Sequence, residues 1–333
     1  MAARVAINGL GRIGRATFKI IRETPDLELV AVNDIGAADN LAYLIAYDTV
    51  YGRFGEEVSH SGDALMVGGK RYPVLGEKDP AALPWREMGV DLVFECTGVF
   101  TRKSDLQKHL HAGAKRVILS APAKGEGDVP FVVYGVNEAD TAEAIISTAS
   151  CTTNCIAPVI EVVGRRIGIE KAIMTTVHAY TASQAIVDGP ASKWRRGRAA
   201  AMNFVPTSTG AAQATTKALP QYDGRFGGVA IRGPVAAGSI ADITMLTARQ
   251  TSVKEINGIF ADEAESDRYA GVIGATAVPL VSSDIIRDPR ASVVDLTMTQ
   301  VVGGNLIKVM AWYDNEWGYA SQMVREGVKL AAR

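Results

Sequence analysis

A glycine-rich turn between an apolar strand and a helical segment constrains the fold most strongly. Residues 4–8 (RVAIN) read as a short strand, helical spacing covers 15–22, and a second strand covers 27–32. Asp34 lies 20 residues beyond the last glycine of the turn. The turn itself consists of Gly9, Leu10, Gly11, Arg12, Ile13 and Gly14. This order of strand, glycine turn, helix, strand and acidic residue predicts a parallel sheet that binds a dinucleotide.

Each part of this pattern has a physical role. Glycines permit a tight turn and a close approach of the backbone to a pyrophosphate, whose charge the helix N-terminus favours. Asp34 can accept hydrogen bonds from a ribose 2′-hydroxyl and would repel a 2′-phosphate, so NAD is predicted over NADP. A glycine-rich turn between two core elements is the alternative, which the full context disfavours. The predicted cofactor residues of this segment are Gly9, Gly11, Arg12, Ile13, Gly14 and Asp34.

Further strands continue the same sheet. Residues 91–96 and 116–119 read as strands, with a helix over 104–113 between them. Ligands of parallel sheets bind at the carboxyl ends of the strands, so Thr97, Gly98 and Ser120 are predicted cofactor contacts. Ordinary turn residues at strand ends are the alternative reading. Residues 55–75 depart from the alternation and predict an inserted hairpin.

The pattern changes after residue 150. A helix over 151–168 is followed by strands over 171–181, 226–235, 240–247, 293–301 and 306–313, with helices over 210–219 and 252–264. Gly303, Gly304 and Asn305 predict a hairpin between the last two strands. The fold class is therefore α/β, with a Rossmann-type NAD-binding domain (1–150) and an α+β catalytic domain (151–315) whose sheet is mainly antiparallel. The helix over 316–333 is expected to pack back on the first domain.

Cys151 begins the helix that opens this second half. The strand-like run 144–148 precedes it, so the thiol lies at a strand-to-helix junction, where the helix dipole favours thiolate. A thiolate is the nucleophile that attacks an aldehyde or acyl group. The alternative is a small buried hydrophobic side chain. The hydroxyl groups of Ser150, Thr152 and Thr153 disfavour that alternative.

Of the four histidines, His178 is the predicted partner of Cys151. It lies at a strand end, where an imidazolium would stabilise the thiolate and later exchange a proton. His109 and His111 lie on a polar helix and are expected to be solvated, and His60 falls in the predicted hairpin.

Two groups of residues are predicted to bind phosphate, because arginine forks, hydroxyls and backbone N–H groups are its usual donors. One group is Thr181, Arg196 and Arg232, and the other is Ser150, Thr152, Thr209 and Gly210. For at least two of Arg195, Arg196 and Arg198 we expect only a solvated basic loop.

Composition excludes several classes of function. Lys plus Arg number 35 and Asp plus Glu number 36, so the net charge of −1 gives no electrostatic case for a nucleic-acid or membrane partner. No apolar run approaches the about 18 residues of a membrane span, and the N-terminus reads as a strand rather than a signal peptide. Cys96, Cys151 and Cys155 form neither a disulfide framework nor a metal-ligand pattern. We expect a cytoplasmic protein without a metal.

Five motifs together resemble the phosphorylating glyceraldehyde-3-phosphate dehydrogenase family, over the whole length of the chain. They are INGLGRIGR, ASCTTNC, TVHAYT, PTSTGAA and WYDNEWGY. The resemblance implies that Cys151 attacks the aldehyde of glyceraldehyde 3-phosphate and that His178 takes the hydroxyl proton as hydride leaves for NAD. Inorganic phosphate would then release 1,3-bisphosphoglycerate from the thioester, in the glycolysis or gluconeogenesis of glucose metabolism.

The resemblance also implies the roles of the remaining residues. Thr181, Arg196 and Arg232 would hold the C3 phosphate, and the Ser150 group would hold the attacking phosphate. Asn315 would bind the nicotinamide carboxamide. The family forms homotetramers, with the loop around 180–203 at a subunit interface.

Two alternatives accompany this reading. An erythrose-4-phosphate dehydrogenase would need no site for an attacking phosphate, so Thr181 and the Thr209-Gly210 pair favour the glyceraldehyde enzyme. An NAD-sensing binding protein is disfavoured by the intact Cys151 and His178. Gly189 replaces a leucine that often precedes the proline in bacterial NAD-specific members, whereas Asp34 and the apolar Ile35 still favour NAD.

Overall fold

The computed structural model describes residues 2–125, 129–140 and 142–332, and the chain divides into two compact units. Unit 1 comprises the described residues of the ranges 2–132, 138–149 and 323–332. Unit 2 comprises Val133–Asn137 and Ser150–Gln322. None of the helices in these ranges is both long and apolar enough to cross a bilayer.

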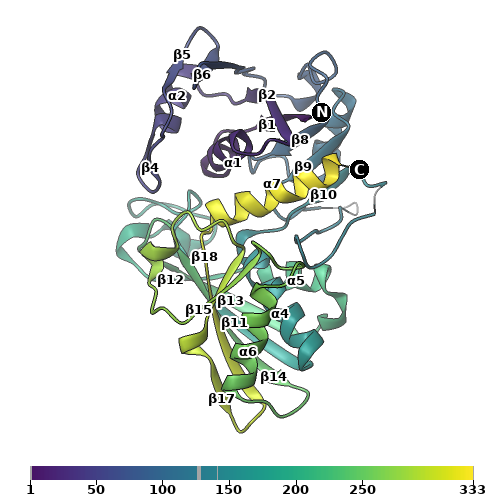
Figure 1. The fold of residues 1–333 in the computed structure, drawn as a ribbon. Coiled ribbons are helices and arrows are strands. Elements are labelled where there is room, and N and C mark those ends of the chain that lie inside the picture. Colours follow the sequence, from purple (N-terminus) through teal and green to yellow (C-terminus); the bar gives the residue numbers. More distant parts are fainter. Residues whose placement is uncertain (1, 126–128, 141, 333) are drawn as a thin grey trace. The chain divides into compact units, whose positions relative to one another are not determined.

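Unit 1 contains a five-stranded sheet in the order β10-β9-β8-β1-β2, with every pairing parallel (Figure 1). The apolar centres of its strands are buried on both faces, as parallel strands covered by helices must be. This confirms the predicted parallel sheet. The strands are β1 (Ala3–Asn8), β2 (Leu27–Asn33), β8 (Leu92–Glu95), β9 (Arg116–Leu119) and β10 (Ile145–Ser147).

Helices pack on this sheet, and glycine allows one of them to approach closely. These helices are α1 (Arg12–Arg22), α3 (Lys103–His111) and the unit 1 part of α7 (Trp317–Ala331), whereas α2 (Ala38–Ala46) packs on the inserted strands described below. A Cβ atom at Gly327 of α7 would lie 2.6 Å from the Phe94 ring of β8. Glycine there lets the helix backbone rest directly on an aromatic side chain of the sheet.

The expectation that His109 is solvated is wrong. His109 is 0% exposed, because its ring lies between Trp85 and the carboxyl group of Glu95. His111, at the end of the same helix α3, is exposed as expected. The polar sequence of α3 thus conceals one inward-facing histidine.

The inserted segment is a three-stranded antiparallel sheet rather than a simple hairpin. It consists of β5 (Val58–His60), β6 (Ala64–Val67) and β7 (Lys70–Pro73). The strand pair β3 (Tyr47–Asp48) and β4 (Gly52–Arg53) and helix α2 precede it, and the sequence pattern did not predict them.

Unit 2 contains an eight-stranded mixed sheet in the order β12-β13-β11-β14-β18-β16-β15, with β17 also paired to β18. Its pairings are parallel at β11–β13 and β15–β16 and antiparallel elsewhere, which confirms the mainly antiparallel prediction. The strands are β11 (Ile169–Ala179), β12 (Val205–Ser208), β13 (Phe226–Gly233), β14 (Ser239–Thr247), β15 (Ile273–Thr276), β16 (Ser292–Asp295), β17 (Gln300–Val302) and β18 (Leu306–Tyr313).

The single strand predicted over 293–301 is wrong, because it is interrupted. The Asp295 carboxylate accepts hydrogen bonds from the Thr297 N–H (3.1 Å) and hydroxyl (2.6 Å), and this closes a 3-10 turn over Leu296–Met298. The predicted hairpin at Gly303 and Gly304 does join β17 to β18.

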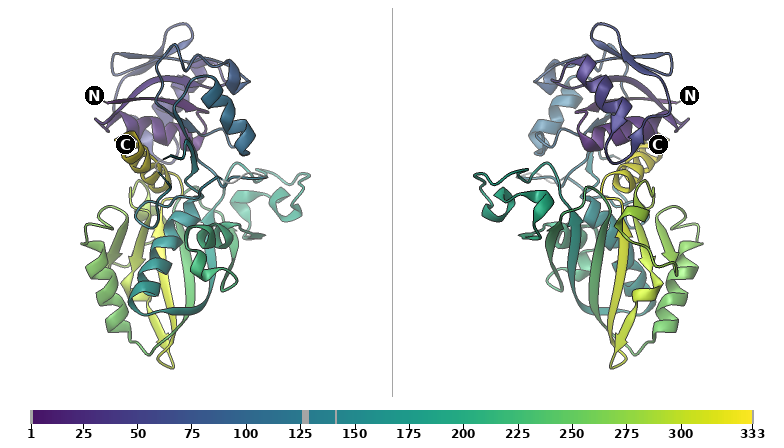
Figure 2. Two further views of the ribbon diagram at one scale, coloured as in Figure 1. Left: turned by 90° about the vertical axis from the view of Figure 1, so that its right-hand side faces the viewer. Right: turned by 90° about the vertical axis from the view of Figure 1, so that its left-hand side faces the viewer.

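Helices α4 (Cys151–Arg166), α5 (Ala211–Ala218) and α6 (Val253–Ala264) pack in unit 2 (Figure 2). Alternation along β11 buries Met174, Thr176 and His178 on one face and exposes Ile173 and Val177 on the other. The buried face joins α4 in the apolar core, so His178 points toward the helix that Cys151 begins. Short 3-10 helices complete the fold at Pro80–Ala82, Trp194–Gly197, Ala200–Met202, Pro220–Tyr222 and Ser282–Ile285.

Candidate active site

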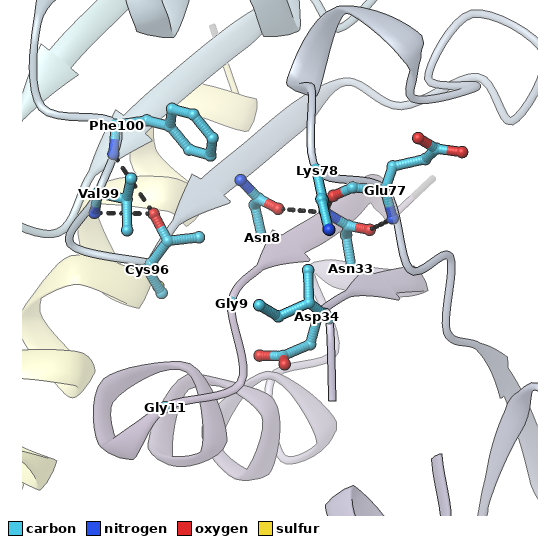
Figure 3. A pocket seen from close by; sticks show the side chains of 12 residues that line it. Asn8, Gly9, Gly11, Asn33, Asp34, Glu77, Lys78, Cys96, Val99 and Phe100 are labelled. Carbon is cyan, nitrogen blue, oxygen red and sulfur yellow. Dashed lines mark hydrogen bonds between the residues drawn. The ribbon is translucent and has the colours of Figure 1, made fainter. Parts of the chain in front are cut away.

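Unit 1 has a pocket at the carboxyl ends of β1, β2 and β8, above the glycine turn (Figure 3). The pocket brings together four residues that the sequence predicted for the cofactor, Gly9, Gly11, Asp34 and Thr97. Its other lining residues are Asn8, Asn33, Ile35, Glu77, Lys78, Cys96, Val99 and Phe100. None of these eight was predicted as a cofactor contact, although the sequence already counted Ile35 in favour of NAD. For Asn8 and Asn33 the available signal was that each ends a strand.

The glycines of the turn leave the space that the backbone and the pyrophosphate of a dinucleotide need. Gly9 has φ +94°, and a Cβ atom on it would lie 2.8 Å from the backbone of Thr97. A Cβ on Gly14 would lie 1.9 Å from the Gly9 carbonyl oxygen, so only glycine lets α1 start this close to the turn. A Cβ on Gly11 would meet no atom within 4 Å. The open space at the N-terminus of α1 suits a pyrophosphate.

Two backbone N–H groups hold the Asp34 carboxylate at the end of β2. Leu10 N–H donates to Oδ2 (2.7 Å) and Gly36 N–H donates to Oδ1 (2.8 Å). Carboxylate oxygens can accept more than one hydrogen bond, so both can still receive ribose hydroxyls. The fixed negative charge opposes a 2′-phosphate, and these residues therefore fit NAD.

The five other predicted cofactor residues of unit 1 do not line this pocket. The Arg12 guanidinium donates to Asp48 (2.6 Å), and Ile13 is half-buried in α1. Gly14 packs under the turn. Gly98 follows the pocket wall with φ +70°, and the Ser120 N–H donates to the Glu95 carbonyl oxygen (3.0 Å).

In unit 2, Cys151 is the first residue of α4. Ala149, two residues earlier, has φ +57°, an uncommon conformation for a residue other than glycine. Ser150 caps the helix, and its hydroxyl accepts the Thr153 N–H (3.2 Å). Burial raises the pKa of the Cys151 thiol, and this outweighs the opposing effects of Arg232, Thr152 and backbone N–H groups at the helix start.

His178 lies against Cys151, with Nε2 3.3 Å from Sγ. Its Nδ1 lies 2.5 Å from an Arg232 nitrogen and 2.7 Å from the Ala179 carbonyl oxygen. Arginine can only donate, so Nδ1 is the acceptor and Nε2 carries the hydrogen that faces sulfur. The same arginine nitrogen also donates to Ala179 (3.1 Å).

Burial and the Arg232 charge lower the pKa of His178 to about 3. The imidazole is therefore neutral near pH 7 in this arrangement. The sequence led us to expect an imidazolium beside the thiolate, whereas the structure provides a neutral N–H donor and a nearby arginine. The parallel register that sets His178 opposite Arg232 on β13 was not visible in the sequence.

Tyr313 is a site residue that the sequence reasoning missed. Its hydroxyl lies 2.9 Å from the Thr152 hydroxyl and 2.8 Å from the Thr176 hydroxyl. Its ring meets the His178 ring edge-on, with centroids 5.9 Å apart. Tyr313 thus links the start of α4 to the strand that carries His178, and its place in the WYDNEWGY motif was the available signal.

Two of the residues predicted to bind the C3 phosphate, Arg232 and Arg196, lie near His178. Arg232 Nε is buried and has no hydrogen-bond partner within the described residues. Arg196 donates to the Thr207 hydroxyl (3.0 Å) on β12, which pairs with β13. Burial, followed by the charge of Arg196, lowers the pKa of Arg232. Two nearby arginines, one with a buried unpaired N–H, form a suitable site for an anion.

The rest of this loop agrees with the sequence. Thr181, two residues after Ala179, shares a 2.8 Å hydrogen bond with Ser183. Arg195 and Arg198 are exposed, and Arg198 pairs with Asp188 (2.7 Å). The expectation that at least two of the three loop arginines are solvated is confirmed.

The residues predicted to bind the attacking phosphate lie at the starts of two helices. Ser150 caps α4 and Gly210 precedes α5, and these two helices pack together. The Thr209 hydroxyl accepts the Ala211 N–H (3.1 Å). Thr152 is buried with its hydroxyl on Tyr313, so in this arrangement it faces the protein interior.

Asn315 is held in one orientation. The Ser239 hydroxyl donates to Asn315 Oδ1 (2.9 Å) and accepts the Ala179 N–H (3.1 Å). The amide nitrogen of Asn315 is then the group that can donate to a carboxamide. In the described part of the chain, no group of His, Cys, Asp and Glu side chains could hold a metal ion.

Comparison with known proteins gives two family matches. Residues 3–103 match the NAD-binding domain of glyceraldehyde 3-phosphate dehydrogenase, and residues 150–315 match its C-terminal domain. The chain is 47% identical to the Streptomyces coelicolor glyceraldehyde-3-phosphate dehydrogenase over 97% of both chains. It is 45% identical to the Zymomonas mobilis enzyme over 99% of both chains, and 46% identical to the plasmid-encoded Cupriavidus necator enzyme over 99% of both.

Proposed function

Because the chain belongs to the glyceraldehyde-3-phosphate dehydrogenase family and is an NAD-dependent oxidoreductase, we propose that it is the phosphorylating enzyme of glucose metabolism. It would convert glyceraldehyde 3-phosphate, NAD and inorganic phosphate to 1,3-bisphosphoglycerate, in glycolysis or gluconeogenesis. The contact of Cys151 Sγ with His178 Nε2, beside an arginine with a buried unpaired N–H, carries this proposal.

Binding of the substrate would start the chemistry at Arg232. The C3 phosphate would take donors from Arg232, Arg196 and Thr181, and Arg232 Nε has no other partner in the described part of the chain. As the Arg232 fork turns to the phosphate, its positive charge is neutralised. His178 can then carry its ring hydrogen on Nδ1, donated to the Ala179 carbonyl oxygen, and its Nε2 is free to take the Cys151 thiol proton, which leaves a thiolate beside an imidazolium.

Oxidation would then proceed through Cys151. The thiolate attacks the aldehyde carbon and forms a thiohemiacetal, whose oxygen takes a proton from His178 Nε2. NAD, when bound, supplies the acceptor for the hydride. His178 Nε2 takes back the hydroxyl proton as the hydride leaves the same carbon, and a thioester remains on Cys151. Asn315 would hold the carboxamide through its amide nitrogen.

Inorganic phosphate would complete the cycle. Its oxygen attacks the thioester carbonyl, the carbon–sulfur bond breaks, and Cys151 leaves as thiolate. The hydroxyls of Ser150 and Thr209 and the Gly210 backbone would hold the attacking ion at the helix starts, and the Thr152 hydroxyl would join them once it turns away from Tyr313. The oxyanions would be stabilised by His178 and by the backbone N–H of Cys151.

We also propose the homotetrameric state of the family. The loop over 180–203 and the residue after it expose large apolar side chains, including Ile186 (88%), Trp194 (88%) and Phe204 (72%). The open face of the unit 2 sheet exposes Ile173 and Val229 as well. Exposed apolar groups in this number favour contact with further copies of the chain. The three free cysteines support the cytoplasm as its compartment.

Steady-state NAD reduction tests the proposal. With glyceraldehyde 3-phosphate we expect sustained turnover with phosphate or arsenate, and little beyond the first turnover without either. Erythrose 4-phosphate is the control, because an enzyme of that alternative releases its acid to water. Turnover with erythrose 4-phosphate that exceeds turnover with glyceraldehyde 3-phosphate and needs no phosphate would overturn the proposal.

A further inference from the structure

A buried hydrogen-bond network lies beneath the dinucleotide pocket of unit 1. It is formed by Asn8, Asn33 and Glu95, which are the last residues of the neighbouring strands β1, β2 and β8. The parallel register sets Asn8 opposite both Asn33 and Glu95. All three side chains are almost fully buried. The three strand ends therefore present polar side chains in one row across the sheet.

The Glu95 carboxyl group is the centre of this network. Its Oε2 receives the Asn8 amide (2.5 Å) and lies 3.1 Å from His109 Nε2. Its Oε1 receives the Thr97 N–H (2.8 Å) and the Thr97 hydroxyl. Each oxygen thus accepts two hydrogen bonds. A carboxylate is the side chain that can do so, because it offers only acceptors.

Trp85 fixes the donor state of His109. The Trp85 indole N–H donates to His109 Nδ1 (3.0 Å), and an indole can only donate. Nδ1 therefore accepts, and Nε2 carries the hydrogen that points at Glu95. The three side chains are each fully buried, so this contact does not depend on solvent.

The other end of the network reaches the pocket wall. Asn8 Oδ1 receives the Asn33 amide (2.7 Å), and Asn33 also exchanges two hydrogen bonds with the Glu77 backbone (2.8 Å each), as Figure 3 shows. The Thr97 hydroxyl accepts the Val99 N–H (3.1 Å). Asn8, Asn33, Glu77, Thr97 and Val99 all line the pocket.

We propose that Glu95 is a positioning residue for NAD. It is oriented by His109 and Trp85, and it sets the walls of the dinucleotide pocket through Asn8 and Thr97. Glu95 itself does not line the pocket, so it acts through these two side chains. Without the network, the Asn8 amide and the Thr97 hydroxyl at these strand ends could rotate to other orientations. Because these walls are already ordered, NAD binding carries a smaller free-energy cost for ordering them.

Two matched sets of variants test this in the full-length protein. Glu95→Gln keeps the shape of the side chain. Whichever way the amide turns, its NH2 group faces two hydrogen-bond donors, either Asn8 and His109 or the two donors of Thr97. His109→Phe removes both hydrogen bonds of the ring, and His109→Gln restores a donor toward Glu95. His111→Gln, on the exposed side of the same helix, is the control.

The measurements are calorimetric Kd values for NAD and ADP-ribose, melting temperature, and hydrogen exchange of the unliganded protein. We expect Glu95→Gln and His109→Phe to raise both Kd values about three- to tenfold, the range of one lost hydrogen bond. His109→Gln should restore most of the affinity. Exchange should rise in the peptides that carry Thr97 and Glu77, and kcat at saturating NAD should stay within about twofold of the wild type.

Two results would overturn the proposal. Glu95→Gln and His109→Phe with wild-type Kd values and a lower melting temperature would show that the network only stabilises unit 1. Equal loss of affinity in His109→Phe and His109→Gln would show that the donor to Glu95 is not what positions the pocket. If Glu95→Gln does not fold, the His109 pair decides alone.

Discussion

Replacement of Arg232 by glutamine separates recognition of the substrate phosphate from the chemistry at Cys151. Arg232 has one buried nitrogen without a partner and one that donates to His178 and Ala179. A hydrogen bond to a charged group contributes about 1.5–3 kcal/mol, which corresponds to about 10- to 150-fold in an equilibrium or rate constant. We expect kcat/KM for glyceraldehyde 3-phosphate to fall by that factor, mostly through KM.

The assay compares this substrate with unphosphorylated glyceraldehyde, which lacks the C3 phosphate. We expect the Arg232→Gln variant to lose much less activity with glyceraldehyde than with glyceraldehyde 3-phosphate, since glyceraldehyde has no phosphate to form a charge-assisted hydrogen bond with Arg232 and any loss through Cys151 is shared by both substrates. Arg195→Gln is the matched control, because it removes one positive charge from an exposed position of the neighbouring loop. It should leave both substrates nearly unaffected.

Alkylation of the thiol gives an independent readout of the same arginine. Burial raises the pKa of Cys151 and the Arg232 charge opposes that rise, so removal of the charge should move rapid alkylation by neutral iodoacetamide to higher pH. Equal losses with the phosphorylated and unphosphorylated aldehydes, with a lower melting temperature, would refute the reasoning. Arg232 would then support the fold of unit 2 without reading the phosphate.

Three further substitutions test the other assigned roles. His178→Asn should move alkylation of Cys151 to higher pH, because an N–H donor 3.3 Å from the sulfur is lost; an unchanged pH profile would contradict this. Asp34→Ala should reduce the preference for NAD over NADP, measured as kcat/KM for both cofactors, because the charge opposing a 2′-phosphate is gone; a wild-type preference for NADP would contradict the assignment. Thr209→Ala should raise KM for inorganic phosphate while KM for glyceraldehyde 3-phosphate stays the same; a reversed pattern would exchange the two phosphate sites.

Local features made much of this molecule predictable. The glycine turn and Asp34 act within one strand–helix–strand unit, so their spacing alone indicates a dinucleotide site. Cys151 was predictable for the same reason, since a helix start is a local property. The glycine turn and the helix start are both determined by residues next to them in the sequence, so both can be predicted from the sequence.

Tertiary contacts explain what the sequence could not show. His109 follows a polar pattern on α3, and its burial depends on Trp85 and Glu95, which are distant in the sequence. The neutral state of His178 depends on the register of β11 with β13, which brings Arg232 to its ring. Strand β12 was missed because Pro206 resembles a turn residue, although proline is tolerated in a strand at the edge of a sheet.

The central claim is that oxidation leaves an acyl group on Cys151. The direct measurement is peptide mass spectrometry of enzyme quenched in acid after mixing with NAD and glyceraldehyde 3-phosphate, without inorganic phosphate. We expect one 3-phosphoglyceroyl group on the peptide that contains Cys151, its loss after a chase with phosphate, and no adduct in Cys151→Ser. NAD reduction with an unmodified Cys151 peptide, or sustained turnover by Cys151→Ser, would contradict the account.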